Sequence, residues 1–249
     1  MNTQNPAETR PDDALREDES SPFARRSTCV DSLDTLPRDR SRVSLLRRAL
    51  DGGAAVRDGL LRGLNGRVLF PLRFAYLETR LAPYLAEYSS VLDVGTSCGR
   101  LAQRLQNRLG NEFVGVDVTP HPHPVRPVIL YDGQTLPFPD NSFDCVMMID
   151  MLHHEEAQAA LLAEARRVAR KVVFIKDHYW TNRLDFQLLK FADFIGNKPY
   201  GVALPYRYLT MAEWQTLFGA GRLRIARAEQ FRYNWADICR HVIFELRKV

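Results

Sequence analysis

The sequence predicts a doubly wound α/β fold with a mostly parallel, seven-stranded sheet, an N-terminal helical extension and a helical cap insertion. Three observations support this prediction. From Ser90 onward, short apolar runs alternate with helical patterns, which is typical of parallel βαβ units. A loop of small residues joins the first apolar run directly to a helix. The composition of the 249 residues, 45% hydrophobic and 26% charged, is that of a globular domain.

The composition also excludes several classes of protein. No run approaches the roughly 18 apolar residues that cross a bilayer, and the first thirty residues lack the apolar segment of a secretory signal. The cysteines at 29, 98, 145 and 239 are far apart and form no CxxC pair, so we expect no disulfide scaffold and a cytoplasmic location. A net charge of +4 is too small to indicate a nucleic-acid binder. A single soluble domain is expected.

Residues 1–42 differ from the rest of the chain. They are rich in charged residues, Ser, Thr and Pro and nearly lack long apolar groups, so they cannot bury enough surface to offset the entropy of ordering. A disordered tail is predicted there. From Val43 the apolar spacing becomes helical, and a second helix is expected over about 72–88 with Pro71 in its first turn. The arginines of these helices form either a solvated face or a contact with an anionic membrane.

Beyond Ser90 each element follows from its local pattern. The predicted strands are 91–94, 113–118, 128–131, 143–149 and 172–176, with helices over 101–109 and 155–170. Thr210 and Glu213 have the spacing of a capping box, which predicts the start of another helix. Two final strands over 223–230 and 241–246 have no crossover helix between them, so we expect them to be antiparallel.

The clearest motif is the loop between the first strand and its helix. Gly95 permits a tight turn and close approach of a ligand, and the helix that begins near Gly99 offers free amide N–H groups to a polar or anionic group. The pattern departs from the dinucleotide fingerprint, because Ser97 and Arg100 stand where that fingerprint has glycine.

Acidic residues lie at the ends of successive strands. Asp117 comes 22 residues after Gly95, where a carboxylate can accept both hydroxyls of a ribose, and Asp132 follows the next strand. Each acid alone could be a loop or helix-capping residue. Together with Asp93 they occupy one edge of the sheet, where α/β folds bind their ligands.

With these residues the sequence resembles the class I S-adenosylmethionine-dependent methyltransferases, in particular the small-molecule branch related to the ubiquinone/menaquinone methyltransferases. The resemblance rests on VLDVGTSCGRLAQRL at 91–105, FVGVDVT at 113–119, DGQTLPFPDNSFDCVMMIDMLHH at 132–154 and RRVARKVVFIKD at 166–177. It implies a Rossmann-like methyltransferase fold, S-adenosyl-L-methionine as the cofactor, and enzymatic transfer of its methyl group.

The resemblance also implies which residues hold the cofactor. The methionine part is assigned to Asp93 and the loop 95–99, the ribose to Asp117 and the adenine end to Asp132-Gly133. The full predicted set is Asp93, Gly95, Thr96, Ser97, Gly99, Asp117, Asp132, Gly133 and Asp150. Two departures from the family pattern are Ser97 in place of the commoner glycine, and the absence of Pro-Gly-Gly before the fifth strand.

With this interpretation residues 43–249 form one methyltransferase domain. Residues 43–88 supply N-terminal helices, 90–178 the cofactor-binding core, 179–209 a substrate cap insertion, and 210–249 the C-terminal helix and strand pair. The cap segment is too long for a plain connection and rich in aromatic residues, which favours a pocket for a small or lipid-like acceptor. Its aromatic residues could instead be the core of the cap.

Candidate general bases follow the fourth and fifth strands. They are His153, His154, Asp177 and His178. Imidazole titrates near neutral pH and therefore suits proton removal from an acceptor hydroxyl. For His153 and His154 a structural or capping role stays open.

No metal site is predicted. A set made of His153, His154, Glu155, Glu156 and Asp177 would place two ligands on adjacent residues, which is a poor ligand spacing.

The expected partner is a small-molecule acceptor, with no nucleic acid. Peripheral membrane contact through Val43–Arg80 stays open, and the sequence does not indicate an oligomeric state. The alternatives are a non-catalytic S-adenosylmethionine-binding or membrane-surface adaptor, an RNA methyltransferase, and an NAD-type oxidoreductase.

Overall fold

The structure is a computed structural model, and it describes residues 59–60, 63, 70–198, 201–235 and 237–249. The helices are α2 (Phe70–Leu85), α3 (Arg100–Leu109), α4 (Gln158–Val168), α5 (Arg183–Asn197) and α6 (Met211–Ala220), with a short 3-10 turn, η2, at Leu152–His154. The strands are β1 (Ser90–Val94), β2 (Glu112–Asp117), β3 (Val128–Leu130), β4 (Phe143–Ile149), β5 (Ala169–His178), β6 (Leu223–Phe231) and β7 (His241–Lys248). The predicted tail 1–42 and nearly all of the first predicted helix lie outside the described residues.

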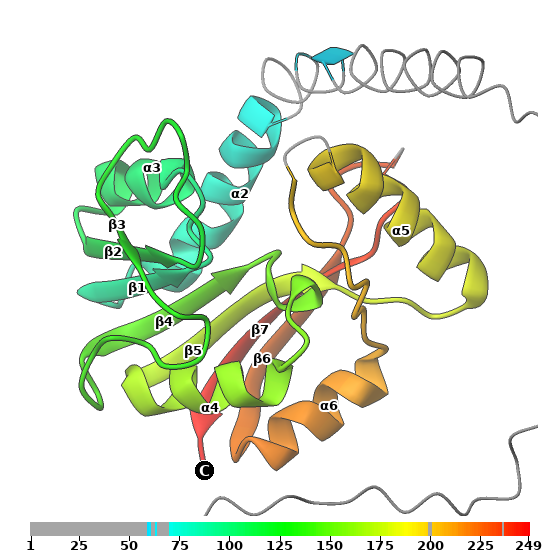
Figure 1. Ribbon diagram of the computed structural model, residues 1–249. Coiled ribbons are helices and arrows are strands. Elements are labelled where there is room, and N and C mark those ends of the chain that lie inside the picture. The colour runs from blue at the N-terminus through cyan, green and yellow to red at the C-terminus, as the bar shows by residue number, and fades with distance from the viewer. Residues whose placement is uncertain (1–58, 61–62, 64–69, 199–200, 236) are drawn as a thin grey trace, which may run out of the picture. The chain divides into compact units, whose positions relative to one another are not determined.

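The seven strands form one sheet in the order β3-β2-β1-β4-β5-β7-β6 (Figure 1). All neighbouring pairs are parallel except β5–β7 and β6–β7, so β7 is the antiparallel strand. The predicted doubly wound, mostly parallel sheet is confirmed, as is the antiparallel final pair. Since β1 lies between β2 and β4, the carboxyl ends of these three strands meet at one edge.

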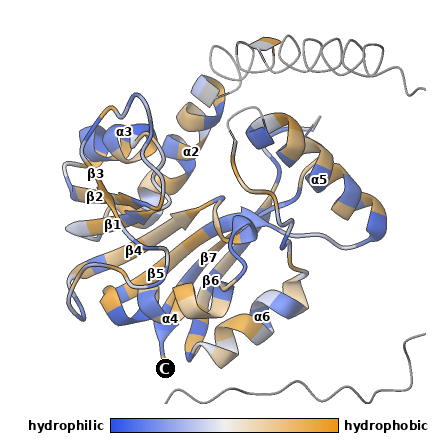
Figure 2. Cartoon of the chain, viewed as in Figure 1, coloured by the Kyte–Doolittle hydropathy of each residue, from blue (hydrophilic) through white to orange (hydrophobic). Residues whose placement is uncertain are grey.

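Two apolar clusters cover the two faces of the sheet. Along β5 the buried side chains alternate, with Val173 and Ile175 in one cluster and Val172 and Phe174 in the other. Helices α4 and α6 pack on the first face, and α2 and α3 on the second. Figure 2 shows the apolar character of the central strands. Burial on both faces explains why residues 145–149 of β4 form a continuous apolar run rather than an alternating one.

Helix α2 packs its apolar side on the second face through Leu77, Leu81 and Leu85, each at most 1% exposed. Its last turn contains Pro83, and the side-chain amide of Asn111 donates hydrogen bonds to the carbonyls of Leu85 and Tyr88. The bond to Leu85 satisfies a carbonyl that the end of the helix leaves without an intrahelical partner. The predicted helix over 72–88 is thus present, with earlier ends.

The remaining sequence predictions match the described elements with shifted ends. The predicted helix over 155–170 is shorter, because residues 152–154 form a 3-10 turn and β5 already pairs with β4 at Ala169. The capping box of α6 is confirmed: Thr210 accepts from the Glu213 amide, and Glu213 accepts from the Thr210 amide. Helix α5 falls within the predicted cap segment 179–209 and lies beyond the carboxyl end of β5 (Figure 1).

Among the described residues, no helix is both long and apolar enough to cross a membrane. The segment Val43–Arg80, for which the sequence leaves membrane contact open, lies largely outside the described part of the chain. Two of its arginines are described, and both pair with acids of the domain: Arg73 with Asp150, and Arg80 with Glu229.

Candidate functional site

The loop after β1 makes a tight turn against β2 and η2. Gly95 has a φ of 74°, and its amide donates to the Val116 carbonyl at 3.0 Å. A Cβ on Gly95 would lie 3.1 Å from the Cβ of Met151, the residue before η2. A side chain at position 95 would therefore crowd Met151, whereas glycine lets the two backbone segments lie close together. The Thr96 side chain packs against Gly115 in β2. A Cβ on Gly115 would lie only 2.7 Å from the Thr96 Cγ2 atom.

Asp117 at the end of β2 is joined to this loop. The Ser97 amide donates to Asp117 Oδ2 at 2.8 Å, and the Thr119 amide donates to Oδ1 at 3.1 Å. Ser97 has a φ of 54°, a left-handed conformation that a glycine would adopt with less strain. The structure therefore brings the predicted methionine loop and the predicted ribose residue together at the carboxyl edge of the sheet.

Asp93 lies beneath the loop and is buried. Its carboxyl accepts a hydrogen bond from Thr96 Oγ1 at 2.6 Å. Burial raises the pKa of Asp93 to about 7, although the Thr96 hydroxyl opposes this rise. The carboxyl thus fixes Thr96 at the turn.

Asp132 and Gly133 follow β3 on the same edge. Asp132 is exposed, and its Oδ1 accepts from the amides of Thr135 and Gln134, both at 2.8 Å. These bonds lower the pKa of Asp132. Gly133 has a φ of 79°, and a Cβ there would lie 3.3 Å from a methyl of the exposed Val118. The Asp132 side chain therefore stabilises the turn that follows it, and the absence of a side chain on Gly133 leaves space next to Val118.

These residues fit S-adenosylmethionine. The N-cap of α3 is Gly99, which has no side chain to cap the helix, so the first amides of α3 have no side-chain cap. Three positions with left-handed backbone, Gly95, Ser97 and Gly99, form the turn that leads into this end of the helix. A glycine-lined loop, helix amides and the Asp117 carboxylate are the groups that a nucleoside with an amino-acid tail requires.

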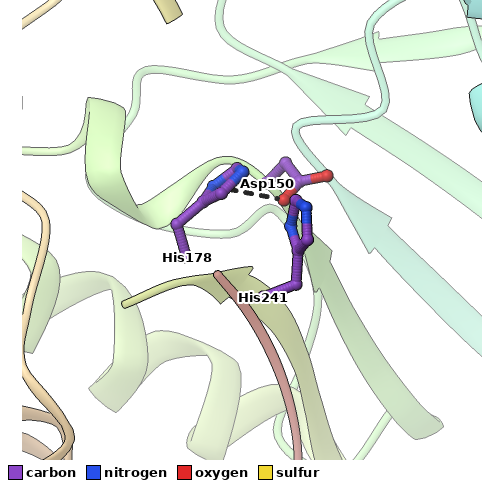
Figure 3. Close-up of side chains that lie close together, drawn as sticks. All are labelled: Asp150, His178 and His241. Carbon is purple, nitrogen blue, oxygen red and sulfur yellow. Dashed lines mark ion pairs between the residues drawn. The ribbon is translucent and has the colours of Figure 1, made fainter. Parts of the chain in front are cut away.

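Asp150 follows β4 and belongs to a second, more buried group. Its carboxylate lies 2.5 Å from Arg73 Nη2 and 2.5 Å from Lys176 Nζ, and its Oδ1 is 3.5 Å from His178 Nδ1. Figure 3 shows Asp150 with His178 and His241 around it. The two cations hold the pKa of Asp150 well below its usual range despite burial, which opposes this effect. The sequence placed Asp150 with the cofactor residues, and that assignment stays a prediction.

Lys176 is the centre of this group, with a fully buried side chain. Besides Asp150, its ammonium lies 3.1 Å from the Tyr233 hydroxyl and 3.0 Å from His241 Nδ1. His241 Nε2 lies 2.9 Å from Asp237 Oδ2. Burial and the adjacent ammonium lower the pKa of His241 to about 3. His241 is therefore neutral, accepts from Lys176 at Nδ1 and donates to Asp237 at Nε2.

His153 lies between two carboxylates. Its Nδ1 is 2.6 Å from Asp177 Oδ1, and its Nε2 is 3.8 Å from Asp193 Oδ1. Its ring stacks on Tyr208, whose hydroxyl donates to Asp193 Oδ2 at 2.7 Å. Burial opposes protonation, but the two aspartates outweigh it and raise the pKa of His153 to about 10. A buried, protonated imidazole is poorly suited to remove a proton from a substrate.

His154 and His178 are the more accessible imidazoles, with side chains 17% and 16% exposed. His154 Nδ1 lies 2.9 Å from the Ala203 carbonyl, which it therefore meets as a donor. His178 Nδ1 lies between Asp177 Oδ1 at 3.4 Å and Asp150 Oδ1 at 3.5 Å. Burial lowers the pKa of both histidines. Both are neutral at pH 7 and can accept a proton.

The structure thus separates the predicted site residues into two neighbouring groups. The loop 95–99, Asp117, Asp132 and Gly133 line one edge. Asp150, His153, His154, Asp177 and His178 gather where β4 and β5 end. The structure adds residues that the sequence argument did not include: Arg73, Lys176, Asp193, Tyr208, Tyr233, Asp237 and His241. One pattern could have indicated Asp193: it lies on the buried side of α5 together with Asp185 and Leu189, at helical spacing.

Comparisons with known proteins agree with this geometry. Residues 92–174 match the model of a family described as "Methyltransferase domain". The chain is 32% identical over 139 residues to the ubiquinone/menaquinone biosynthesis C-methyltransferase UbiE of Cupriavidus taiwanensis, a match covering 48% of this chain and 57% of that protein. The chain therefore spans little more than half the length of this curated relative.

Solved structures share the fold at low identity. The 1,6-didemethyltoxoflavin-N1-methyltransferase of Burkholderia thailandensis, solved with 1,6-didemethyltoxoflavin and S-adenosylhomocysteine, has a TM-score of 0.54 at 19% identity, covering 80% of this chain and 89% of that one. The PH0226 protein of Pyrococcus horikoshii has a TM-score of 0.55 at 18% identity, covering 72% and 91%. The chain thus contains a methyltransferase domain, matched over residues 92–174, on the Rossmann-like fold of these solved structures.

Proposed function

We propose that this protein transfers the methyl group of S-adenosylmethionine to a small or lipid-like molecule in the cytoplasm. The observation that supports this best is the link between Ser97 and Asp117. An amide of the glycine loop donates to the carboxylate at the end of β2, so the ribose position and the methionine loop are held in one rigid unit. When bound, S-adenosylmethionine supplies an electrophilic methyl group, and the protein needs mainly to position the acceptor.

The acceptor site is proposed at the carboxyl ends of β4 and β5, beside the cofactor loop. Met151 approaches the loop at Gly95, and the residues that follow it lead into η2 and the histidines. Aromatic side chains surround His178, with Tyr208 at 6.2 Å and His241 at 4.6 Å between ring centroids. Rings beside a few polar groups suit a small planar or lipid-like acceptor.

For an acceptor hydroxyl, His178 is the proposed general base. It is neutral because burial lowers its pKa, and its ring is partly exposed. Asp177 and Asp150 lie on the Nδ1 side of the ring, which orients the imidazole through one nitrogen. His153 has the same neighbour, Asp177, but is buried and protonated. We therefore assign His153 and Asp177 to positioning rather than proton transfer.

The cofactor step is tested by calorimetric titration with S-adenosylmethionine. The unmodified protein is expected to bind one equivalent, and Asp117→Asn to lose at least about tenfold in affinity, because a charge-assisted acceptor for the ribose becomes an amide. Asp140→Asn is the matched control, since Asp140 is exposed and away from the loop. Absence of binding, or equal affinities for the two variants, contradicts the proposal.

The transfer step is tested with an isotopically labelled methyl donor and an extract of small molecules and lipids. A labelled product detected by mass spectrometry identifies both the reaction and the acceptor. His178→Gln is expected to lower kcat at unchanged affinity for the cofactor. Labelled RNA instead of a small product would favour an RNA methyltransferase, and cofactor binding without any labelled product would favour an adaptor.

A further inference from the structure

We propose that His153, His154 and Asp193 bind one divalent transition-metal ion, in a site that joins η2 to the cap helix α5. Its ligands do not include any residue of the cofactor loop, so metal binding can be measured separately from binding of S-adenosylmethionine.

Three ligand atoms converge at this point. Asp193 Oδ1 lies 3.8 Å from His153 Nε2 and 3.7 Å from His154 Nε2, and all three atoms lie within 4.8 Å of one another. Metal–ligand bonds of about 2.0–2.2 Å in a tetrahedron place two ligand atoms about 3.3–3.6 Å apart. The two distances to Asp193 Oδ1 would shorten by a few tenths of an ångström on binding, and the two imidazole nitrogens start no more than 4.8 Å apart.

Each ligand is oriented by a further hydrogen bond on its far side. His153 Nδ1 faces Asp177 at 2.6 Å, and His154 Nδ1 faces the Ala203 carbonyl at 2.9 Å. A histidine that binds a metal through one nitrogen usually donates the other N–H to a carboxylate or a carbonyl. Both imidazoles thus direct Nε2 to the common point, although they are adjacent in sequence.

The carboxylate of Asp193 is fixed in the same way. Tyr208 donates to its Oδ2 at 2.7 Å, and the Asn197 side-chain amide donates to its Oδ1 at 2.5 Å. Oδ1 therefore keeps one lone pair for an ion while its position is set by two donors. Asp193 comes from α5, so one bound ion would hold the cap helix on the 3-10 turn.

The charges around this point also suit a dication. Asp177 and Asp193 bring two carboxylates to this point, on either side of His153. Both carboxylates are largely inaccessible to solvent. A dication with two neutral imidazoles balances the two carboxylates, and the proton on His153 then leaves to solvent. His154 is 17% exposed and gives the ion a route of entry.

Two neighbouring groups of potential ligands are occupied by protein contacts instead. Asp150, His178 and His241 surround the Lys176 ammonium, which lies 2.5 Å from Asp150 and 3.0 Å from His241. That ammonium fills the position an ion would take. In the group of His153, Asp177 and His178, Asp177 Oδ1 already accepts from the His178 amide and from His153 Nδ1.

Two imidazoles and one carboxylate favour zinc or a similar first-row ion over calcium or magnesium. Three protein ligands leave a coordination position for water or for an oxygen of a substrate, as in catalytic rather than structural zinc sites. His178 lies close by, with its ring centroid 5.2 Å from that of His153.

The experiment uses the full-length protein, freed of metal with a chelator and titrated with zinc sulfate against a zinc-binding dye. We expect one equivalent to bind, and His154→Ala and Asp193→Asn each to weaken binding by at least tenfold. His121→Ala is the matched control, because His121 lies in the loop between β2 and β3, outside the ligand group, and should keep full affinity. Absence of stoichiometric binding, or equal affinity in His154→Ala, overturns the proposal.

A second measurement needs no variant and covers the case in which a substitution unfolds the chain. Cobalt(II) bound by two imidazoles and a carboxylate at low coordination number gives strong visible absorption, whereas hexahydrated cobalt absorbs weakly. Stoichiometric growth of the strong bands, reversed by zinc, is the expected result. A spectrum that stays that of aqueous cobalt overturns the proposal.

Discussion

The Arg73 guanidinium lies 2.5 Å from the Asp150 carboxylate and joins helix α2 to the end of β4. Asp150 adopts a left-handed backbone conformation, with a φ of 51°, and its other oxygen contacts Lys176. Arg73, which precedes the first strand in the sequence, is thereby bound to Asp150, where the proposed acceptor site begins. The two cations differ in burial: the Lys176 side chain is completely buried, whereas that of Arg73 is 35% exposed.

Because Lys176 is more buried than Arg73, we expect Asp150→Asn and Arg73→Met to lower the free energy of unfolding by different amounts. Asp150→Asn leaves the Lys176 ammonium buried without its carboxylate, and breaking a buried pair in this way lowers the free energy of unfolding by about 3–5 kcal/mol. Arg73→Met removes a partly exposed partner while Lys176 still pairs with Asp150, so about 1 kcal/mol is expected. Urea unfolding of both variants measures the two costs, and equal costs would contradict the central position of Lys176.

The sequence could predict that the loop 95–99 and Asp117 meet at one edge of the sheet, because the signals for this arrangement are local. A strand, a tight turn and a helix N-terminus follow one another within about a dozen residues around Gly95, and Asp117 ends the next strand. Sheet order then brings these segments together through general rules for parallel βαβ units. No side-chain detail was needed for this part.

The acceptor end could not be predicted in the same way. Arg73 is 77 residues from Asp150, and no periodicity of either segment links them. Asp193 comes from the cap helix, whose arrangement depends on tertiary contacts such as Arg240 with Asp185 at 2.8 Å. The metal site weighed from the sequence joined the two histidines to Glu155, Glu156 and Asp177, and it did not include Asp193.

Two glycines with the same backbone conformation provide a test of the cofactor loop. Gly99 and Gly110 both have a φ of 77°. A Cβ on Gly99 would lie 2.4 Å from Cγ of Arg126, whereas a Cβ on Gly110 would have no neighbour within 4 Å. Gly110→Ala should therefore cost only the backbone strain, about 1 kcal/mol, and Gly99→Ala about 1–3 kcal/mol more.

The two glycine variants should also differ in ligand binding. Gly99→Ala must displace Arg126 from its contacts with Gln106 and the Phe113 carbonyl and shift the first turn of α3. Calorimetry with S-adenosylmethionine is expected to show weaker binding for Gly99→Ala and unchanged binding for Gly110→Ala. Equal affinities would mean that the N-terminus of α3 does not contact the cofactor.

The capping box of α6 predicts a smaller, local effect. Thr210→Ala removes the acceptor for the Glu213 amide and should lower the free energy of unfolding by about 1 kcal/mol. Thr216→Ala is the matched control, since the Thr216 hydroxyl donates to the Ala212 carbonyl within the helix and Ala favours helix. Thermal unfolding should therefore show a loss for Thr210→Ala and none for Thr216→Ala.

The adjacent residues His153 and His154 should have opposite effects on the pH dependence of stability in the metal-free protein. The pKa of His153 rises to about 10 in the fold, so its contribution is complete below the unfolded value near 6.5 and is lost as the pH rises toward 10. Relative to His153→Gln, the unmodified protein is expected to lose stability over this range, on the order of a few kcal/mol.

The pKa of His154 is lowered by burial, so the unfolded chain binds the extra proton more readily near pH 6. Relative to His154→Gln, the unmodified protein should gain stability as the pH rises to about 6.5 and show no further change above it. Urea unfolding of both variants between pH 5 and 10 separates the two slopes. Slopes of the same sign would show that Asp177 and Asp193 do not hold a proton on His153, and that this imidazole is instead free to act as a base.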